Sequence, residues 1–195
     1  MKAHNDLAFR RGGTSQFGVI DLIQKFKTAI EQACDRGEFI GDVVFCSFPV
    51  GCCGDTCYLL AEFLHQHKIE TICVSGKIWK QTHAWLVIKN KDIQKKNTSS
   101  KPKVNSSFVS WPNKCTLTVT FDEYYTPDDW GYKSSDLENG IIVDITADQF
   151  GEEPVYVGAM DSFHRNFEFM EAHDYIDLGT PRLLDLYNVI LKYIK

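Results

Sequence analysis

A tight turn that opens an amphipathic helix limits the folds open to this chain more than any other feature. Two glycines bracket a pair of cysteines, in the order Gly51-Cys52-Cys53-Gly54, and a helical pattern of apolar residues then runs to about His67. The start of a helix has N–H groups without partners and a partial positive charge, so a cysteine there loses its proton more easily. The same N–H groups can stabilise an oxyanion. The stretch therefore predicts a reactive thiol at the mouth of a buried helix.

The remaining apolar patterns predict an α+β fold. Helical spacing predicts helices over residues 19–34, stopped near Gly37, and from Thr180-Pro181 towards the C-terminus. Apolar stretches with strand character occupy residues 69–75, 82–88, 140–146 and 154–157, with a turn beginning at Gly76-Lys77 and a short helix capped by Asp161 or Ser162 over residues 161–170. Helices that come first and antiparallel strands that follow are typical of an α+β fold.

Length and composition indicate a single domain over residues 1–195. With 195 residues and 44% hydrophobic content, the chain suffices for one well-buried core. About fifty residues separate strands 82–88 and 140–146, which we expect to be neighbours, so residues 90–138 are predicted to be an insertion. Its first half, rich in lysine, is expected to begin as a surface loop over residues 90–107 and to continue into a strand at 114–121, and its second half is acidic.

Charge and cysteine content exclude several function classes. A net charge of −5 and a pI near 5.7 argue against general binding of nucleic acid. The chain has neither an apolar run of about 20 residues, as a membrane span needs, nor an N-terminal signal sequence, so we expect a cytoplasmic protein with no membrane partner. Seven irregularly spaced cysteines favour reduced thiols.

Three motifs in one order carry the functional hypothesis. A cysteine that opens a helix, then His-Ala-Trp on a strand, then Asp-x-Thr on a later strand resemble the transglutaminase-like branch of the papain-like cysteine enzymes, over about residues 49–146. The resemblance implies a papain-like core in which the helix of the nucleophile packs on an antiparallel sheet. It also implies that Cys53 is the nucleophile, His83 the general base and Asp144 the group that orients His83. Cys52 fits the spacing of the motif less well and is the second choice.

The activity that the resemblance implies is acyl chemistry on amide bonds. An acyl-enzyme on Cys53 would be released by water, as in a peptidase or deamidase, or by an amine, as in a transglutaminase. A protein or peptide substrate is expected, with no cofactor and no metal. The backbone N–H of Cys53 is the expected oxyanion donor, and Asp148 or Gln149 could reach the site from just after Asp144.

Other interpretations of the same residues stay open. Cys53 alone could be a buried structural cysteine and His83 a hydrogen-bonded histidine, although Asp144 lies in an apolar strand and needs a partner. A module that kept the fold without activity is one alternative. A zinc site made by Cys52, Cys53, Cys57 and His83 is another, although adjacent cysteines fit one ion poorly. His164 has no motif around it.

Overall fold

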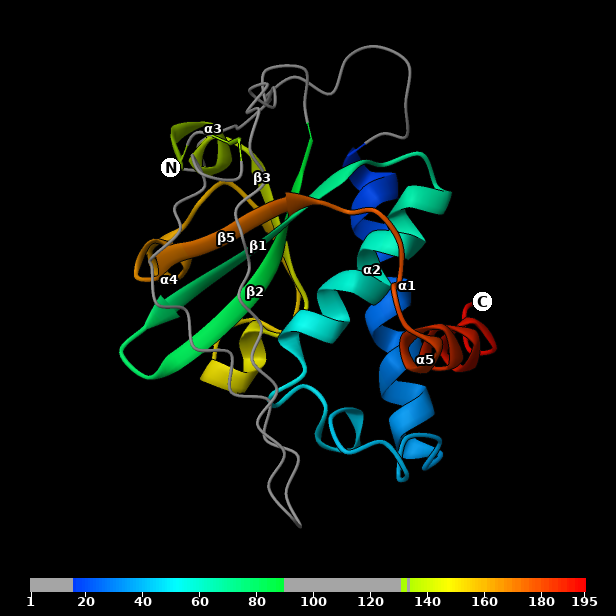
Figure 1. Cartoon of the computed structure of the whole chain (residues 1–195). Coiled ribbons are helices and arrows are strands. Elements are labelled where there is room, and N and C mark those ends of the chain that lie inside the picture. The colour runs from blue at the N-terminus through cyan, green and yellow to red at the C-terminus, as the bar shows by residue number, and fades with distance from the viewer. Residues whose placement is uncertain (1–15, 90–130, 133) are drawn as a thin grey trace, which may run out of the picture.

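The protein, seen in a computed structural model, is a mixed α+β fold in which helices cover one side of an antiparallel sheet (Figure 1). The structure describes residues 16–89, 131–132 and 134–195. The five-stranded sheet has the order β4-β3-β2-β1-β5, with β1 at Thr71–Ile78, β2 at Gln81–Ile88, β3 at Ile141–Asp144, β4 at Tyr156–Gly158 and β5 at Glu168–Asp174. Helices α1 (Gln16–Asp35), α2 (Cys53–Gln66) and α5 (Pro181–Leu191) pack together on one side, with α2 against β1 and β2.

Local signals set the ends of these helices. Helix α1 stops where Gly37 takes a positive φ of 74°, and its N–H donates to the carbonyl of Cys34 at 2.9 Å. Helix α5 begins at Pro181 because the Thr180 hydroxyl accepts a hydrogen bond from the Leu183 N–H at 3.2 Å. The predicted stop and start signals are therefore confirmed.

The sheet separates two hydrophobic cores. Leu86, Ile88 and Val143 face α2 and join the larger core with α1 and α5. Trp85, Val87 and Ile142 point the other way into a second core, to which Phe167, Tyr132 and Leu137 of the covering segments also belong. Leu137 comes from α3 (Ser134–Glu138), directly before β3. His83 and Asp144 follow the alternation of this second face, so both side chains lie on the same side of the sheet.

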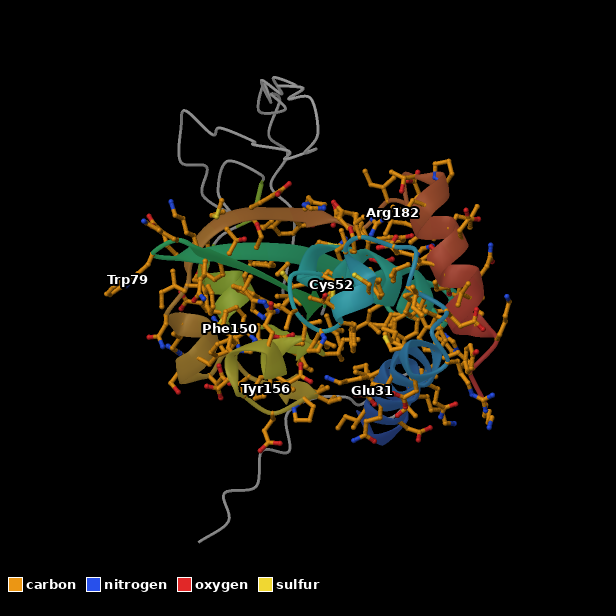
Figure 2. The ribbon with its side chains drawn as sticks, turned by 90° about the horizontal axis from the view of Figure 1, so that it is seen from below. Glu31, Cys52, Trp79, Phe150, Tyr156 and Arg182 are labelled. Atoms are coloured by element: carbon orange, nitrogen blue, oxygen red, sulfur yellow. The ribbon has the colours of Figure 1, made fainter. Side chains whose placement is uncertain are left out.

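The turn expected at Gly76-Lys77 is wrong, because both residues belong to β1. The chain reverses instead at Trp79, which is 91% exposed and marks the tip of the hairpin (Figure 2). Gly76 serves close packing: a Cβ there would lie 2.7 Å from Cβ of Phe167 and 3.0 Å from Cη2 of Trp85. The pairing of β1 with β5 also shifts register between Ser75 and Gly76.

The helix expected over residues 161–170 is only partly correct. Asp161 caps α4 as predicted, but α4 covers just Ser162–Arg165, and the chain then enters β5. Strand β5 was not predicted. It pairs antiparallel with β1, whose edge would otherwise have unpaired N–H and C=O groups, so tertiary hydrogen bonding outweighs the local helical preference.

Several expectations fall partly or wholly outside the described residues. The surface loop at 90–107 and the strand at 114–121 lie outside them, as does Cys115. The six described cysteines are all free thiols, as predicted. No helix within the described ranges has the length and apolar character to cross a membrane.

Candidate active site

The turn before α2 sets the two adjacent cysteines in different surroundings. Gly51 has a positive φ of 74°, Cys52 is the N-cap residue and Cys53 is the first residue of α2. No side chain caps the first turn, so its backbone N–H groups can still donate to a ligand oxygen. Arg182 of α5 steadies this region, because its guanidinium donates to Asp42 in the preceding loop and to Asp55 of α2, each at 2.7 Å (Figure 2).

Cys52 and Cys53 differ in burial and partners. Cys52 is 1% exposed; its thiol donates to the carbonyl of Pro49 at 3.3 Å and accepts from the Thr56 hydroxyl at 3.5 Å. Burial raises the pKa of Cys52 to about 12, which keeps it protonated at neutral pH. Cys53 is half-buried, and its thiol lies close enough to His83 to contribute to the raised pKa of that ring. The geometry therefore favours Cys53 as the reactive thiol.

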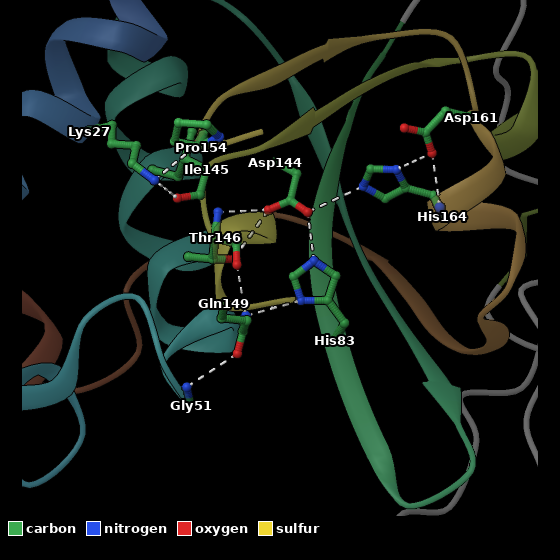
Figure 3. Close-up of polar contacts among 10 residues, drawn as sticks. All are labelled: Lys27, Gly51, His83, Asp144, Ile145, Thr146, Gln149, Pro154, Asp161 and His164. Atoms are coloured by element: carbon green, nitrogen blue, oxygen red, sulfur yellow. Dashed lines mark hydrogen bonds and ion pairs between the residues drawn. The ribbon is translucent and has the colours of Figure 1, made fainter. Parts of the chain in front are cut away.

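His83 and Asp144 form a buried pair across β2 and β3 (Figure 3). Nε2 of His83 lies 2.6 Å from Oδ2 of Asp144, so its N–H donates to the carboxylate. The other carboxylate oxygen, Oδ1, accepts from the N–H of Thr146 at 2.8 Å and from its hydroxyl at 3.2 Å. Nδ1 of His83 is therefore the ring nitrogen that remains for other partners, and Nε2 of Gln149 lies 3.4 Å from it.

Each member of this pair stabilises the charge of the other. Burial alone would lower the pKa of His83, but its hydrogen bond with Asp144 and then the neighbouring Cys53 thiol outweigh that effect and raise the pKa to about 9. Burial alone would raise the pKa of Asp144, yet hydrogen bonds from His164 and His83 hold it well below its usual range. Both groups are thus charged near neutral pH.

Gln149 reaches the site from η2 (Ala147–Phe150), whereas Asp148 does not. The Gln149 Oε1 accepts from the N–H of Gly51 at 3.3 Å, and its Nε2 donates to the carbonyl of Thr146 at 3.0 Å. These two partners fix which end of the amide is nitrogen. Nε2 lies 3.4 Å from Nδ1 of His83, on the side of the ring that faces Cys53. Gln149 is therefore a side-chain donor beside the reacting atoms.

Lys27 holds the η2 segment in place, and nothing in the sequence analysis singled it out. It is 2% exposed on α1, and its ammonium donates to the carbonyls of Ile145 at 2.9 Å and Pro154 at 2.8 Å and to Asp148 at 2.6 Å. The sequence could have indicated that Lys27 is buried, because it follows the buried Phe26 directly and precedes the buried Ile30 by three residues.

His164 is a second buried histidine on Asp144, and the sequence offered it only as a weak candidate. Its Nε2 lies 3.2 Å from Oδ2 of Asp144, and its Nδ1 lies 2.7 Å from Oδ1 of Asp161. The available signal was the spacing of a helix-capping aspartate and a histidine three residues later. Aromatic rings line the same side of the site: the centroids of Phe150, Phe163 and Phe167 lie 5.0, 5.7 and 5.5 Å from that of His83.

The structure does not gather the four residues of the alternative zinc site. Among the described residues, the one group of three or more potential metal ligands is His83, Asp144 and His164, with ligand atoms within 4.8 Å of one another. That group contains no cysteine. Its members are hydrogen-bonded directly to each other.

Comparisons with protein-family models, curated proteins and solved structures gave no match to this chain. The geometry of the site is therefore the basis for a functional conclusion.

Proposed function

We propose that this chain is a cysteine-dependent hydrolase or acyltransferase with a papain-like core of the transglutaminase-like type, acting on amide bonds. One observation carries the proposal: a half-buried cysteine at the start of a helix lies beside a histidine that a buried aspartate holds through Nε2. Cys53, His83 and Asp144 also follow one another in the chain order of that superfamily. The sheet and the position of α2 on it are compatible with such a core.

The proposed reaction proceeds through an acyl-enzyme. The Cys53 thiolate forms a bond to the carbonyl carbon, and the C=O electron pair moves onto the oxygen. When the C–N bond breaks, Nδ1–H of His83 protonates the leaving amine, and Asp144 keeps the ring oriented through Nε2–H. Water or an amine then attacks the thioester, while Nδ1 of His83 takes its proton and the thiolate leaves. The products are an acid or a new amide.

Two donors stabilise the oxyanion in this mechanism. The backbone N–H of Cys53 lies in the uncapped first turn of α2, where the partial positive charge of the helix start favours an anion. Gln149 supplies the second donor, because its Nε2 is held beside Nδ1 of His83 by Gly51 and Thr146.

Thiol reactivity tests the proposal without knowledge of the substrate. The chain is alkylated with iodoacetamide at pH 6, and the modified cysteines are quantified by peptide mass spectrometry. Cys53 should react at least about tenfold faster than Cys46, an exposed thiol in the same chain that serves as the internal control. In His83→Ala this advantage should disappear. If Cys53 and Cys46 were alkylated at equal rates in the wild-type protein, the chain would instead be a module that kept the fold without activity.

The substrate and compartment remain part of the proposal. A protein or peptide amide is the substrate class that the chemistry favours. Free thiols at all six described cysteines suit a reducing compartment, so a cytoplasmic location is proposed with it.

A further inference from the structure

His164 is a buried histidine with a carboxylate at each ring nitrogen (Figure 3). Its side chain is 1% exposed, with Nε2 at 3.2 Å from Asp144 and Nδ1 at 2.7 Å from Asp161. An ionised carboxylate only accepts hydrogen bonds. A neutral imidazole would turn one nitrogen lone pair towards a carboxylate oxygen in a buried site, which is unfavourable. Hydrogen bonds donated to both carboxylates require a proton on each ring nitrogen, as in an imidazolium.

We propose that His164 is a positioning residue of the active site, an imidazolium held by Asp161 that locks the Asp144 carboxylate onto His83. This role rests on the proposed function. Asp144 then has two hydrogen bonds on each oxygen: Thr146 donates both to Oδ1, and the two histidines share Oδ2. Without His164, Oδ2 would have one partner and the carboxylate could turn.

The charges alternate along the resulting chain of groups. Carboxylates and imidazole rings alternate in the order Asp161, His164, Asp144 and His83, with the Cys53 thiol beyond them. The ring centroids of His164 and His83 lie 6.4 Å apart, so the two cations repel each other in a site with little water. His83 therefore releases its proton more readily than it would without His164. A general acid and base must release this proton in each catalytic cycle.

The groups that face His164 come from each element packed around it. They are Asp161 at the start of α4, Asp144 on β3, His83 on β2 and Tyr156 on β4, whose ring centroid lies 5.2 Å away and whose hydroxyl bonds to the carbonyl of Ala159. Two carboxylates, one imidazole ring and one phenol ring thus surround His164.

Nuclear magnetic resonance of ¹⁵N-labelled histidine in the full chain tests this role. Both ring nitrogens of His164, assigned by loss of its signals in His164→Gln, should carry protons at pH 7. The titration midpoint of His83 should rise by about one pH unit in His164→Gln, because a neighbouring cation is lost. Asp161→Asn should also raise the titration midpoint of His83. Asparagine still caps α4, so this second variant should fold.

The control is Asp185→Asn, which neutralises an exposed carboxylate on α5 and should leave the midpoint unchanged. An unchanged His83 midpoint in both test variants, with Cys53 still fast towards iodoacetamide, overturns the role of His164 alone. A wild-type Cys53 no faster than Cys46 removes the proposed function as well. Stoichiometric zinc in the purified chain, lost in both His164→Gln and His83→Gln, also overturns the role, since the residues would then be metal ligands.

Discussion

Two neighbouring cysteines have different surroundings because successive side chains diverge by about 100° at the start of a helix. Cys52 turns inward, between Pro49 and Thr56, while Cys53 turns towards His83. Burial keeps the first thiol protonated, and the second remains accessible to a reagent or substrate.

Alanine at each position separates these roles. Cys53→Ala should abolish the fast alkylation at pH 6 and change the free energy of unfolding by less than about 1 kcal/mol, since a half-buried sulfur makes little packing. Cys52→Ala should leave Cys53 fast but destabilise the fold by about 1–2 kcal/mol through the cavity and the lost contacts. Peptide mass spectrometry measures the rate of alkylation, and urea unfolding measures the free energy of unfolding. Fast alkylation at residue 52 in the Cys53→Ala protein would assign the nucleophile to Cys52.

Gln149 allows a test of the oxyanion site. Gln149→Glu keeps the shape and an acceptor for Gly51, but it removes the Nε2 donor and introduces a negative charge. Turnover of an activated ester such as p-nitrophenyl acetate should fall roughly 10²–10³-fold, while Cys53 remains reactive towards iodoacetamide. Gln24→Glu, on the exposed side of α1, is the control. An undiminished rate in Gln149→Glu would exclude the amide as an oxyanion donor.

At the scale of elements, a buried lysine connects α1 to the segment that carries Gln149. Lys27→Met should destabilise the fold by about 3 kcal/mol, because the carbonyls of Ile145 and Pro154 and the Asp148 carboxylate lose their donor. Adding Asp148→Asn to the Lys27→Met variant should restore part of the lost free energy of unfolding, because it removes the unpaired negative charge. Urea unfolding of the two single variants and the double variant completes the cycle. If the loss of unfolding free energy in the double variant equalled the sum of the losses in the single variants, Lys27 and Asp148 would not be coupled.

Strand β1 depends on the absence of a side chain at Gly76. Gly76→Ala should lower the free energy of unfolding by about 2 kcal/mol or more, because the new Cβ overlaps Phe167 and crowds Trp85. Gly41→Ala is the matched control, since a Cβ there meets no atom within 4 Å. If thermal unfolding showed equal stability for the two variants, close packing would not explain Gly76.

At the scale of the whole molecule, the proton on His83 links stability to pH. The pKa of His83 is about 9 in the folded protein and 6.5 in the unfolded chain, so folding favours the protonated form. Its contribution, on the order of 3 kcal/mol, is complete below pH 6.5, declines as the pH rises and is lost above about 9. Urea unfolding at pH 6 and pH 9.5 should show this decline, and His83→Gln should reduce it. A decline of the same size in His83→Gln would place its origin elsewhere.

Local sequence patterns determined the helix that begins at Cys53, the ends of α1 and α5 and the strand that carries Asp144. Periodicity, glycine and capping residues act over a few neighbouring positions, so these elements could be predicted. The pairing of His83 with Asp144, 61 residues apart, was expected only through the resemblance to a family.

Tertiary structure alone decided the rest of the candidate site. Lys27 bonds to a segment 121 residues away, Gln149 meets Gly51 across 98 residues, and β5 exists because β1 presents an open edge. None of these contacts has a local signature, since each depends on sheet register and on the path of a loop. A buried charge or an unpaired strand edge requires a partner, but only the folded chain determines which residue is close enough to be that partner.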